Sequence, residues 1–393
     1  MKSIAMLQSV RSVSILTLVL VLGVFSSSIV ISRAYAMSIV VPRDFPTVQS
    51  AIDAASPGAT IVVLPGTYRE QLRINKDLNV VGSGAQSTII QAPSSLSAFG
   101  TAGGGFPMAA IVQVTSSARV SISSLTVTGP APGCDTLNPT KIVRLTIGVS
   151  VVNGASISML DSRVTNLRDE PLRGCFSGFA IVIGLPTFLV RGGSVGHGTI
   201  RDVVVDNYQN FGITVTGAGS MATVSDNVVT GVGATPTVAQ IGILVGIGAV
   251  ASVTDNTVAG NICTIPSDCG ADPISQSQGI GVQAFEAMPG TVIADNNVSR
   301  NDVGVSLFFS PECCRTVDNA IRDNRFFGLV IQDSNNTAVN NRISGGNVGV
   351  GVVADFANSI GTLRDNTITL TSVAPTQEIS CCGVTARILI IDS

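Results

Sequence analysis

One short phrase decides the fold, and its tightest recurrence reads Gly304-Val305-Ser306-Leu307, Gly328-Leu329-Val330-Ile331 and Gly349-Val350-Gly351-Val352, at glycine spacings of 24 and 21 residues. Looser copies open at Gly212-Ile213-Thr214-Val215, Gly242-Ile243-Leu244-Val245 and Gly279-Ile280-Gly281-Val282. Each copy closes on an Asn, at Asp226-Asn227, Asp255-Asn256, Asp295-Asn296, Asp323-Asn324, Asn340-Asn341 and Asp365-Asn366. Repetition at a near-constant period predicts a solenoid, in which each unit buries its apolar face against the next unit.

The repeat is β-structure rather than helix. Apolar residues alternate within each copy, so that Ile213 and Val215 point inward and Thr214 points outward, which is the period of a strand. Three short strands and three turns fit into about 22 residues at the rise of a strand. The recurring Asn tolerates the positive φ of a tight bend, and stacked amides can form a ladder of hydrogen bonds. We therefore expect four Asn to stack at one bend of successive coils: Asn256, Asn296, Asn324 and Asn366.

The phrase resembles the repeats of right-handed parallel β-helix proteins of the pectin-lyase-like superfamily. The resemblance covers nearly all of the chain after its first 36 residues and is specific for the fold. It implies an all-β protein: a single-stranded right-handed parallel β-helix (β-solenoid) over 37–393, most regular over 212–370, with an N-terminal α-helical cap.

Residues 43–57 form the expected helix. Phe45, Val48, Ala51, Ile52 and Ala55 fall on one apolar stripe, and Ser56-Pro57-Gly58 ends it. An open β-helix would leave its first coil exposed to water, so we interpret this helix as the cap. The run Asp44–Ala55 with Pro65-Gly66-Thr67-Tyr68-Arg69-Glu70 resembles the opening coil of pectin methylesterases.

Residues 1–36 have the pattern of a cleaved secretory signal. Lys2 and Arg11 precede the apolar core 15–25, and Ala34-Tyr35-Ala36 is a small-x-small cleavage site. An uncleaved anchor over 14–31 is the rival interpretation. No later stretch is apolar enough to span a membrane, so we expect a secreted protein, extracellular or at the cell surface.

The composition favours one elongated domain with few charged residues. Charged residues make up 12% of the chain, about half the usual share. Cleavage would move the net charge from −3 to −6 and leave only Lys76 and Lys141 as lysines. Without a basic stripe, nucleic acid is excluded as a partner. No linker divides the chain, and we expect a monomer.

Eight cysteines follow the signal segment, and an even number in an exported protein predicts disulfides. Cys263 and Cys269 bracket a short excursion and should pair. Cys134 and Cys175 lie in inserted loops and could pair across coils. The partners of the two vicinal couples, Cys313-Cys314 and Cys381-Cys382, stay open, with a four-thiolate zinc site as the alternative.

The expected outward row of the repeat strands reads Thr214, Leu244, Gly281, Ser306, Val330 and Gly351, none of them ionisable. A second row, two residues further on, reads Thr216, Gly246, Gln283, Phe308, Gln332 and Val353. Similarity to the pectin methylesterase motifs would make Asp355 the nucleophile, Asp333 the acid/base, and Gln283 and Gln332 the oxyanion donors. The chain departs from that family because an extra coil separates the two glutamines and there is no Trp.

Two further catalytic patterns are incomplete. Gly196-His197-Gly198 resembles a polygalacturonase motif and contains the only His of the chain, but the acidic partners of that motif are missing. A pectate-lyase site needs acids around calcium, and no such cluster can be assembled from adjacent coils. We expect no cofactor, with calcium as the alternative if the protein is lyase-like.

Three functional hypotheses follow. The first is a non-catalytic β-solenoid that serves for binding or display, with polysaccharide as its partner. The lack of ionisable residues in the outward row favours this hypothesis. The second is an esterase, lyase or hydrolase acting on an acidic polysaccharide. The third is a periplasmic copper-handling protein of the nitrous oxide reductase maturation type, which a single His and few Met do not favour.

Overall fold

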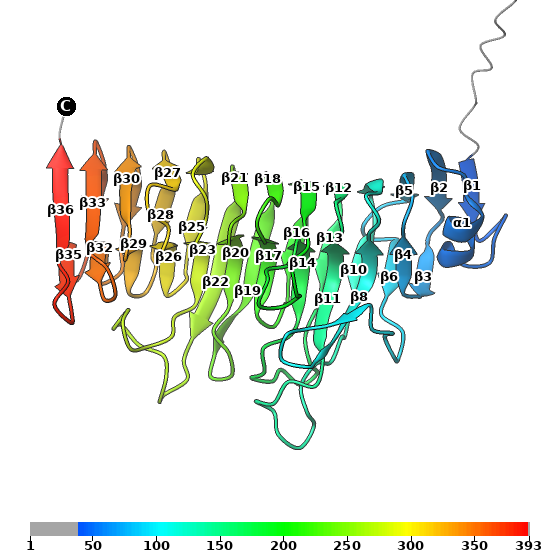
Figure 1. Ribbon diagram of the computed structural model, residues 1–393, viewed down its shortest axis with the longest axis horizontal. Helices are drawn as coiled ribbons and strands as arrows, with labels where there is room; N and C mark the ends of the chain where they lie inside the picture. Colours follow the sequence, from blue (N-terminus) through cyan, green and yellow to red (C-terminus); the bar gives the residue numbers. More distant parts are fainter. Residues whose placement is uncertain (1–37, 392–393) are drawn as a thin grey trace, which may run out of the picture. The chain divides into compact units, whose positions relative to one another are not determined.

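The structure, a computed structural model, describes residues 38–391. Three sheets of parallel strands face one another, and each coil of the chain contributes one strand to each sheet (Figure 1). Sheet A contains β1 (Ser38–Val41), β2 (Ala59–Val63), β5 (Leu78–Gly82), β9 (Arg119–Ser123), β12 (Ala155–Leu160), β15 (Gly196–Arg201), β18 (Met221–Ser225), β21 (Val250–Thr254), β24 (Thr291–Ala294), β27 (Cys314–Val317), β30 (Asn335–Val339), β33 (Ser359–Arg364) and β36 (Ala386–Ile391). Sheet B contains β3 (Gly66–Arg69), β6 (Thr88–Gln91), β10 (Thr126–Thr128), β13 (Arg163–Thr165), β16 (Val204–Asp206), β19 (Val228–Thr235), β22 (Thr257–Cys263), β25 (Asn297–Ser299), β28 (Ala320–Arg322), β31 (Arg342–Ser344) and β34 (Thr367–Thr369).

Sheet C is the third sheet of the solenoid. It contains β4 (Leu72–Ile74), β8 (Pro107–Val114), β11 (Leu145–Val151), β14 (Phe179–Ile183), β17 (Phe211–Thr216), β20 (Ile241–Gly246), β23 (Ile280–Phe285), β26 (Val303–Phe308), β29 (Phe327–Gln332), β32 (Val348–Ala354) and β35 (Ala374–Ser380). The two-residue β7 (Gly100–Thr101) pairs antiparallel with β8. The expectation of an all-β parallel solenoid is confirmed.

The core consists of aliphatic columns that run from coil to coil. In sheet C one column is formed by Ile213, Ile243, Val282, Val305, Leu329 and Val350, which are hydrogen-bonded neighbours in register and fully buried. Because each side chain sits on the equivalent one of the next coil, a one-residue slip would move every one of them to the outer face. The alternation seen in the sequence therefore fixes the register.

An Asn ladder lies at the bend between sheets A and B. Its members are Asn227, Asn256, Asn296, Asn319, Asn341 and Asn366, and each Nδ2 donates to the next Oδ1 at 2.9–3.0 Å. The residue with positive φ is the one before each Asn, for example Asp295 at 57°, and not the ladder Asn itself.

The prediction for Asn324 is wrong. Asn319, in the phrase Asp318-Asn319-Ala320-Ile321, occupies the ladder position of its coil, whereas Asn324 belongs to a second ladder with Asn261 and Asn301. That second ladder lies at the carboxyl ends of the sheet B strands, with Asn261 inside β22 and Asn301 and Asn324 just after β25 and β28. Both Asn in residues 319–324 follow an Asp within one coil, and spacing alone does not separate the two bends.

The helix α1 (Val48–Ala54) is shorter than the expected 43–57. The chain before it forms β1 and a turn in which the Asp44 carboxylate accepts the Val40 N–H, and Thr47 then caps the helix together with Ser50. Ile52 is 1% exposed, and α1 packs against β1, β2 and β4, at the start of the stack of coils in Figure 1.

Long loops connect sheet B to sheet C, and their sequences are the Gly-, Pro- and Cys-rich insertions. One of these connections, 264–279, is held by the Cys263–Cys269 disulfide and by Asp302, whose Oδ2 accepts the Cys263 and Gly279 N–H groups at 2.8 Å. Within residues 38–391 no helix is long and apolar enough to cross a membrane. Residues 1–36, predicted to be a secretory signal, lie outside the described residues.

Candidate functional site

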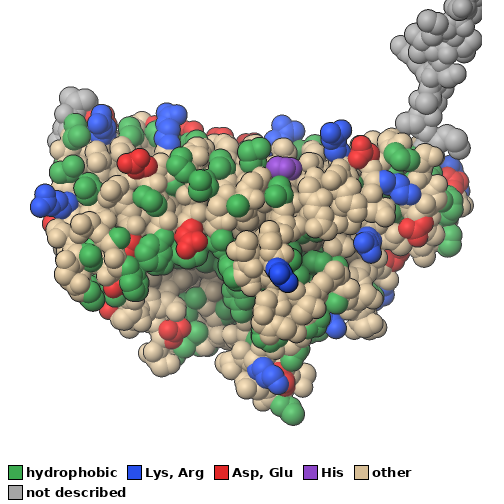
Figure 2. Space-filling model, viewed as in Figure 1, with side chains coloured by type: hydrophobic (Ala, Val, Ile, Leu, Met, Phe, Trp, Pro, Cys, Tyr) green, Lys and Arg blue, Asp and Glu red, His purple; other side chains and the backbone are tan. Residues whose placement is uncertain are grey.

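The outward face of sheet C is uncharged over most of its width. Nine consecutive strands, β8, β11, β14, β17, β20, β23, β26, β29 and β32, contain no Asp, Glu, Lys, Arg or His. Figure 2 shows hydrophobic side chains gathered in the hollowed part of this side of the molecule, with few charged side chains beside them. The strands of this face therefore present apolar, aromatic and neutral polar side chains rather than ionisable groups.

A pocket opens on β14, β17, β20 and β23, with a volume of about 200 Å³. It is lined by Phe176, Phe179, Val182, Leu185, Pro186, Phe188, Leu189, Phe211, Thr214, Thr216, Ile241, Leu244, Ile247, Gln283 and Phe285. Three of its rings meet edge to face: Phe179 lies 4.7 Å from Phe211 and 5.1 Å from Phe176 between ring centroids. Phe176 and Phe188 are about half exposed at the mouth. The pocket is apolar, with Thr214, Thr216 and Gln283 as its polar side chains.

A row of four phenylalanine rings continues from this pocket along the next coils. Phe285 lies 5.4 Å from Phe308, Phe308 stacks on Phe309 at 4.3 Å, and Phe309 lies 5.7 Å from Phe356. Phe356 is 71% exposed, and the other three rings are half-buried. We call these four residues the ring row. It provides a continuous aromatic strip at the carboxyl ends of the sheet C strands.

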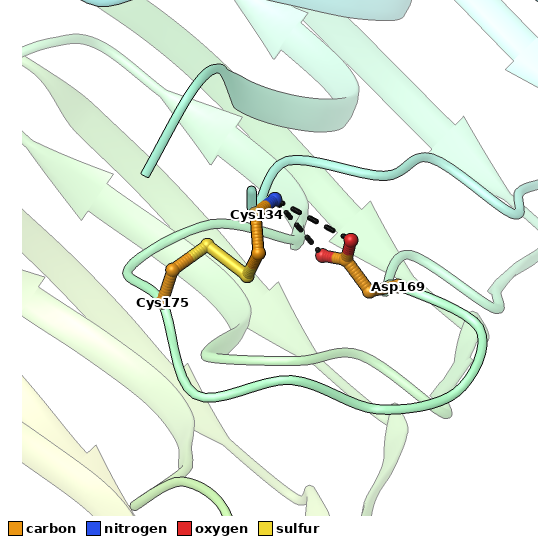
Figure 3. Close-up of side chains that lie close together, drawn as sticks. All are labelled: Cys134, Asp169 and Cys175. Atoms are coloured by element: carbon orange, nitrogen blue, oxygen red, sulfur yellow. Dashed lines mark hydrogen bonds between the residues drawn. A yellow bond between two sulfur atoms is a disulfide. The ribbon is translucent and has the colours of Figure 1, made fainter. Parts of the chain in front are cut away.

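A disulfide-linked pair of loops holds the mouth of the pocket. Cys134 and Cys175 form a disulfide, and the Asp169 carboxylate accepts the Cys134 N–H beside it (Figure 3). Gln209, two residues before β17, donates to the Cys175 carbonyl at 2.9 Å and accepts the Asp169 N–H at 3.0 Å. Phe176 follows Cys175 in the chain, so these contacts set where its ring stands.

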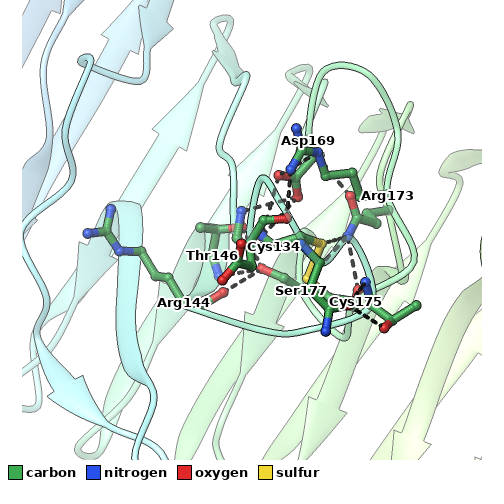
Figure 4. The surroundings of a disulfide bond; sticks show 12 residues. Cys134, Arg144, Thr146, Asp169, Arg173, Cys175 and Ser177 are labelled. Carbon is green, nitrogen blue, oxygen red and sulfur yellow. Dashed lines mark hydrogen bonds and ion pairs between the residues drawn. A yellow bond between two sulfur atoms is a disulfide. The ribbon is translucent and has the colours of Figure 1, made fainter.

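The same loops carry a group of polar contacts around the disulfide (Figure 4). Arg173 donates to the Asp135 carbonyl at 2.7 Å, and the Ser177 hydroxyl donates to the Arg144 carbonyl at 2.9 Å. The Thr146 N–H donates to the same Ser177 oxygen at 3.0 Å. These side chains are buried or half-buried, and their hydrogen bonds join the two loops to each other and to the start of β11.

The register corrects the predicted outward rows at β23. The hydrogen-bonded partner of Leu244 and Ser306 is Gln283, and not Gly281. The inserted loop ends at Gly279, while Gly281 is the equivalent of Gly304: a Cβ on Gly281 would lie 2.7 Å from the Gly304 carbonyl oxygen. Taking Gly279 as the start of the repeat therefore shifted the frame by two residues.

The shift separates the two proposed oxyanion donors. Gln283 belongs to the row of Thr214, and the partner of Gln332 on β26 is Phe308, whose own partner on β23 is Phe285. Gln332 is 7% exposed, whereas Gln283 is half-buried in the wall of the pocket. The structure does not place them side by side on adjacent strands.

Asp333 caps a turn. Its Oδ1 accepts the N–H groups of Asp355, Phe356 and Ala357 at 2.8, 2.9 and 3.0 Å, while its Oδ2 is buried without a hydrogen-bond partner. The pairing of Gln332 with Val353 places Ala354, and not Asp355, beside Asp333 in register. Asp355 is half-buried and lies near Cys381 and Cys382. The backbone of residue 355 thus contacts Asp333 directly.

His197 lies on another sheet. It belongs to β15 of sheet A, where it pairs with Ser156 and Met221, and it is half-buried. The structure therefore does not bring His197 onto the face that carries Asp333, Asp355 and the ring row.

Two groups of cysteine and aspartate side chains within the described residues have the spacing of metal ligands: Cys134 with Asp169 and Cys175, and Asp355 with Cys381 and Cys382. In both groups the sulfurs are joined in disulfides, as are Cys313 and Cys314. Metals are bound by thiolates rather than by disulfide sulfurs. The vicinal couples thus pair internally, which the sequence left open.

Comparison with known proteins matches residues 188–368 to the family model described as right handed beta helix region. No curated protein matches the sequence. Among solved structures, the Azotobacter vinelandii mannuronan C-5 epimerase AlgE4 A-module is 15% identical, with a TM-score of 0.50 over 88% of this chain and 94% of that one. The Yersinia enterocolitica family 28 exopolygalacturonase is 12% identical, with a TM-score of 0.51 over 90% and 78%. The chain has the right-handed parallel β-helix fold.

The sequence did not single out the phenylalanines. The ring row and the pocket mouth come from Phe at the ends of sheet C strands and in the loops beside them, as in Ala284-Phe285 and Leu307-Phe308-Phe309. A search for aromatic platforms limited to Tyr and Trp misses them. The signal in the sequence was limited to Phe285 and Phe308, which both stand four residues after the repeat glycine once the frame at β23 is corrected.

Proposed function

We propose that the protein is an exported β-solenoid that binds an uncharged polysaccharide along the ring row without transforming it. The observation that carries this proposal is a strip of four aromatic rings on a face whose nine strands hold no ionisable residue. The negative face of an aromatic ring attracts the polarised C–H groups of a sugar ring, and rings at an exposed surface bind with little loss of side-chain entropy.

The charge around the ring row favours a neutral chain over a polyuronate. Glu286 is exposed next to Phe285, and Asp355 is half-buried next to Phe356. The carboxylates of an acidic polysaccharide would meet like charges there and would find no Lys or Arg on these strands. Export to the outside or to the cell surface is part of the proposal, and four disulfides support it because they persist in oxidising compartments.

One observation favours the alternative, an enzyme acting on polysaccharide. The Asp333 Oδ2 is buried without a hydrogen-bond partner, which leaves this carboxyl oxygen free to bond to a group of a substrate. The other oxygen of Asp333 is occupied by three backbone N–H groups, which fits a turn-capping role. We therefore prefer binding to turnover.

The test measures binding and turnover with the same protein. Retention on cellulose, xylan, mannan and chitin is compared with retention by polygalacturonate and alginate, and we expect retention by a neutral polymer. Phe309→Ala and Phe356→Ala should each weaken it at least about fivefold, the usual effect of truncating an aromatic anchor. Leu370→Ala, which removes an 86% exposed apolar side chain after β34, is the matched control.

The turnover arm measures reducing ends, unsaturated ends and methanol from methylated pectin, with and without calcium. We expect no product. Product formation that is lost in Asp355→Asn or Asp333→Asn would overturn the non-catalytic proposal in favour of the enzyme.

A further inference from the structure

The pocket at the start of the ring row has the size of a small ring compound. Its volume is about 200 Å³, and apolar cavities of roughly 150 Å³ are known to stay dry and take up benzene. The space fits one six-membered ring with a small substituent and is too small for a saccharide chain. This site adjoins the ring row and shares Phe285 with it, but Phe308, Phe309 and Phe356 do not line the pocket.

The walls favour an aromatic, neutral guest. Phe176, Phe179 and Phe211 meet at interplanar angles of 68–83°, the edge-to-face arrangement that aromatic rings prefer, and an added ring can extend it. Phe285 is a fourth aromatic ring in the lining. No lining residue carries a charge, so a carboxylate or ammonium group would lose its water without gaining an ion pair.

One polar side chain in the pocket has no partner. Thr214 is 4% exposed, lines the pocket from β17, and its Oγ1 has no hydrogen-bond partner, although the neighbouring Thr216 hydroxyl donates to the Gly184 carbonyl. A buried hydroxyl left without a partner is unfavourable, and a guest that bonds to it removes that cost. Because a hydroxyl can both donate and accept, a hydroxyl on the guest satisfies Thr214 in either direction.

From these observations we propose that the pocket is a binding site for a neutral single-ring phenol. The ring lies among Phe176, Phe179, Phe211 and Phe285, and its hydroxyl bonds to Thr214. Gln283, half-buried in the same wall, offers a second polar contact toward the mouth.

The experiment titrates the full chain with phenol and three comparators, by calorimetry and ligand-observed NMR. Cyclohexanol has the hydroxyl without the aromatic ring, toluene has the ring without the hydroxyl, and benzoate adds a charge. We expect phenol to bind more tightly than all three. Equal or tighter binding of cyclohexanol or benzoate would overturn the proposed ligand class.

Three variants locate the site. Thr214→Val keeps the side-chain shape and should lower phenol affinity roughly three- to tenfold while leaving that of toluene unchanged. Leu244→Phe places a ring in the pocket and should abolish binding of both, with circular dichroism and the Tm showing that the variant folds. Ser306→Ala, in the same outward row but outside the pocket, is the control and should change nothing.

Two results would refute the assignment: an unchanged phenol-to-toluene ratio in Thr214→Val, or full phenol binding by folded Leu244→Phe. Phe356→Ala separates this site from the polysaccharide surface, because it should weaken saccharide retention and leave phenol binding intact. Failure of either proposal is thus visible without the other.

Discussion

Removal of one amide from the middle of the Asn ladder should destabilise the protein far more than removal of one near its end. Asn296 is 1% exposed, and its Nδ2 donates to the Val253 and Ala294 carbonyls at 2.9 Å and to Asn319 at 3.0 Å. Its Oδ1 accepts both the N–H and the Nδ2 of Asn256 at 3.0 Å. Asn296→Ala deletes all of these contacts at once.

The magnitude follows from the groups left behind. The Asn256 N–H and the Val253 carbonyl lose their partner in a site that water does not reach, and each such loss costs about 1–3 kcal/mol. We expect a decrease of about 3 kcal/mol in the free energy of unfolding. Asn366 makes the same kind of contacts, with Asn341, Ala338 and Arg364, but it is half-buried, so water can replace them. Asn366→Ala should cost about 1 kcal/mol.

Urea unfolding of both variants measures the difference, and amide hydrogen exchange shows where it arises. Stacked coils can unfold in segments, so the midpoint is read together with local protection. The Asn256 N–H should exchange slowly in the wild type and in Asn366→Ala, and rapidly in Asn296→Ala. Equal costs in the two variants, or an Asn256 N–H still protected in Asn296→Ala, would refute the reasoning.

Two further predictions concern stability. Ile52 lies on the buried face of α1 and is 1% exposed, so Ile52→Asp places a charge there and should promote aggregation through the uncovered first coil. Ala54→Asp, at an exposed position of the same helix, should not, and light scattering distinguishes the two variants. A monomeric Ile52→Asp of wild-type stability would mean that α1 is not a cap. Burial raises the pKa of the Asp302 carboxyl above its ordinary value of 3.8, so the folded state keeps the proton to higher pH than the unfolded chain does. Stability should therefore fall as pH rises from 3.8 through the raised pKa, and Asp302→Asn should flatten that part of the urea-midpoint profile; equal slopes would contradict this.

The fold could be predicted from the sequence because the same physical constraint repeats in every coil. Inward positions must be apolar and must match the coil above, so the alternation of Ile213 and Val215 recurs at Val305 and Leu307 with few exceptions. Because the pattern is present in several copies, a deviation in one copy does not prevent recognition of the repeat. Residues 91–198, where the copies are degenerate and the loops long, could be assigned only as further coils.

The frame within one coil was harder to predict than the fold. Gly279 and Gly281 both open an alternating run, and only the close approach of Gly281 to the Gly304 backbone shows which of them is the repeat glycine. In the same way Asn319 and Asn324 both follow an Asp, and only the hydrogen bonds assign them to different ladders. The local sequence is compatible with either glycine as the repeat glycine and with either Asn as the ladder residue. Contacts with the neighbouring coil determine which of them occupies the position.

The candidate site escaped prediction for a related reason. An outward position on a β-helix is not constrained by the core, so Thr214, Leu244 and Gln283 occupy one row with no shared chemistry. What unites them is a wall of loop residues that arrives from insertions of variable length: Phe176 follows Cys175 of the Cys134–Cys175 disulfide, and Phe188 comes from the connection between β14 and β15. Periodicity carries no information about such a wall. The repeats therefore specify where a ligand can lie, and the insertions between them specify which ligand it is.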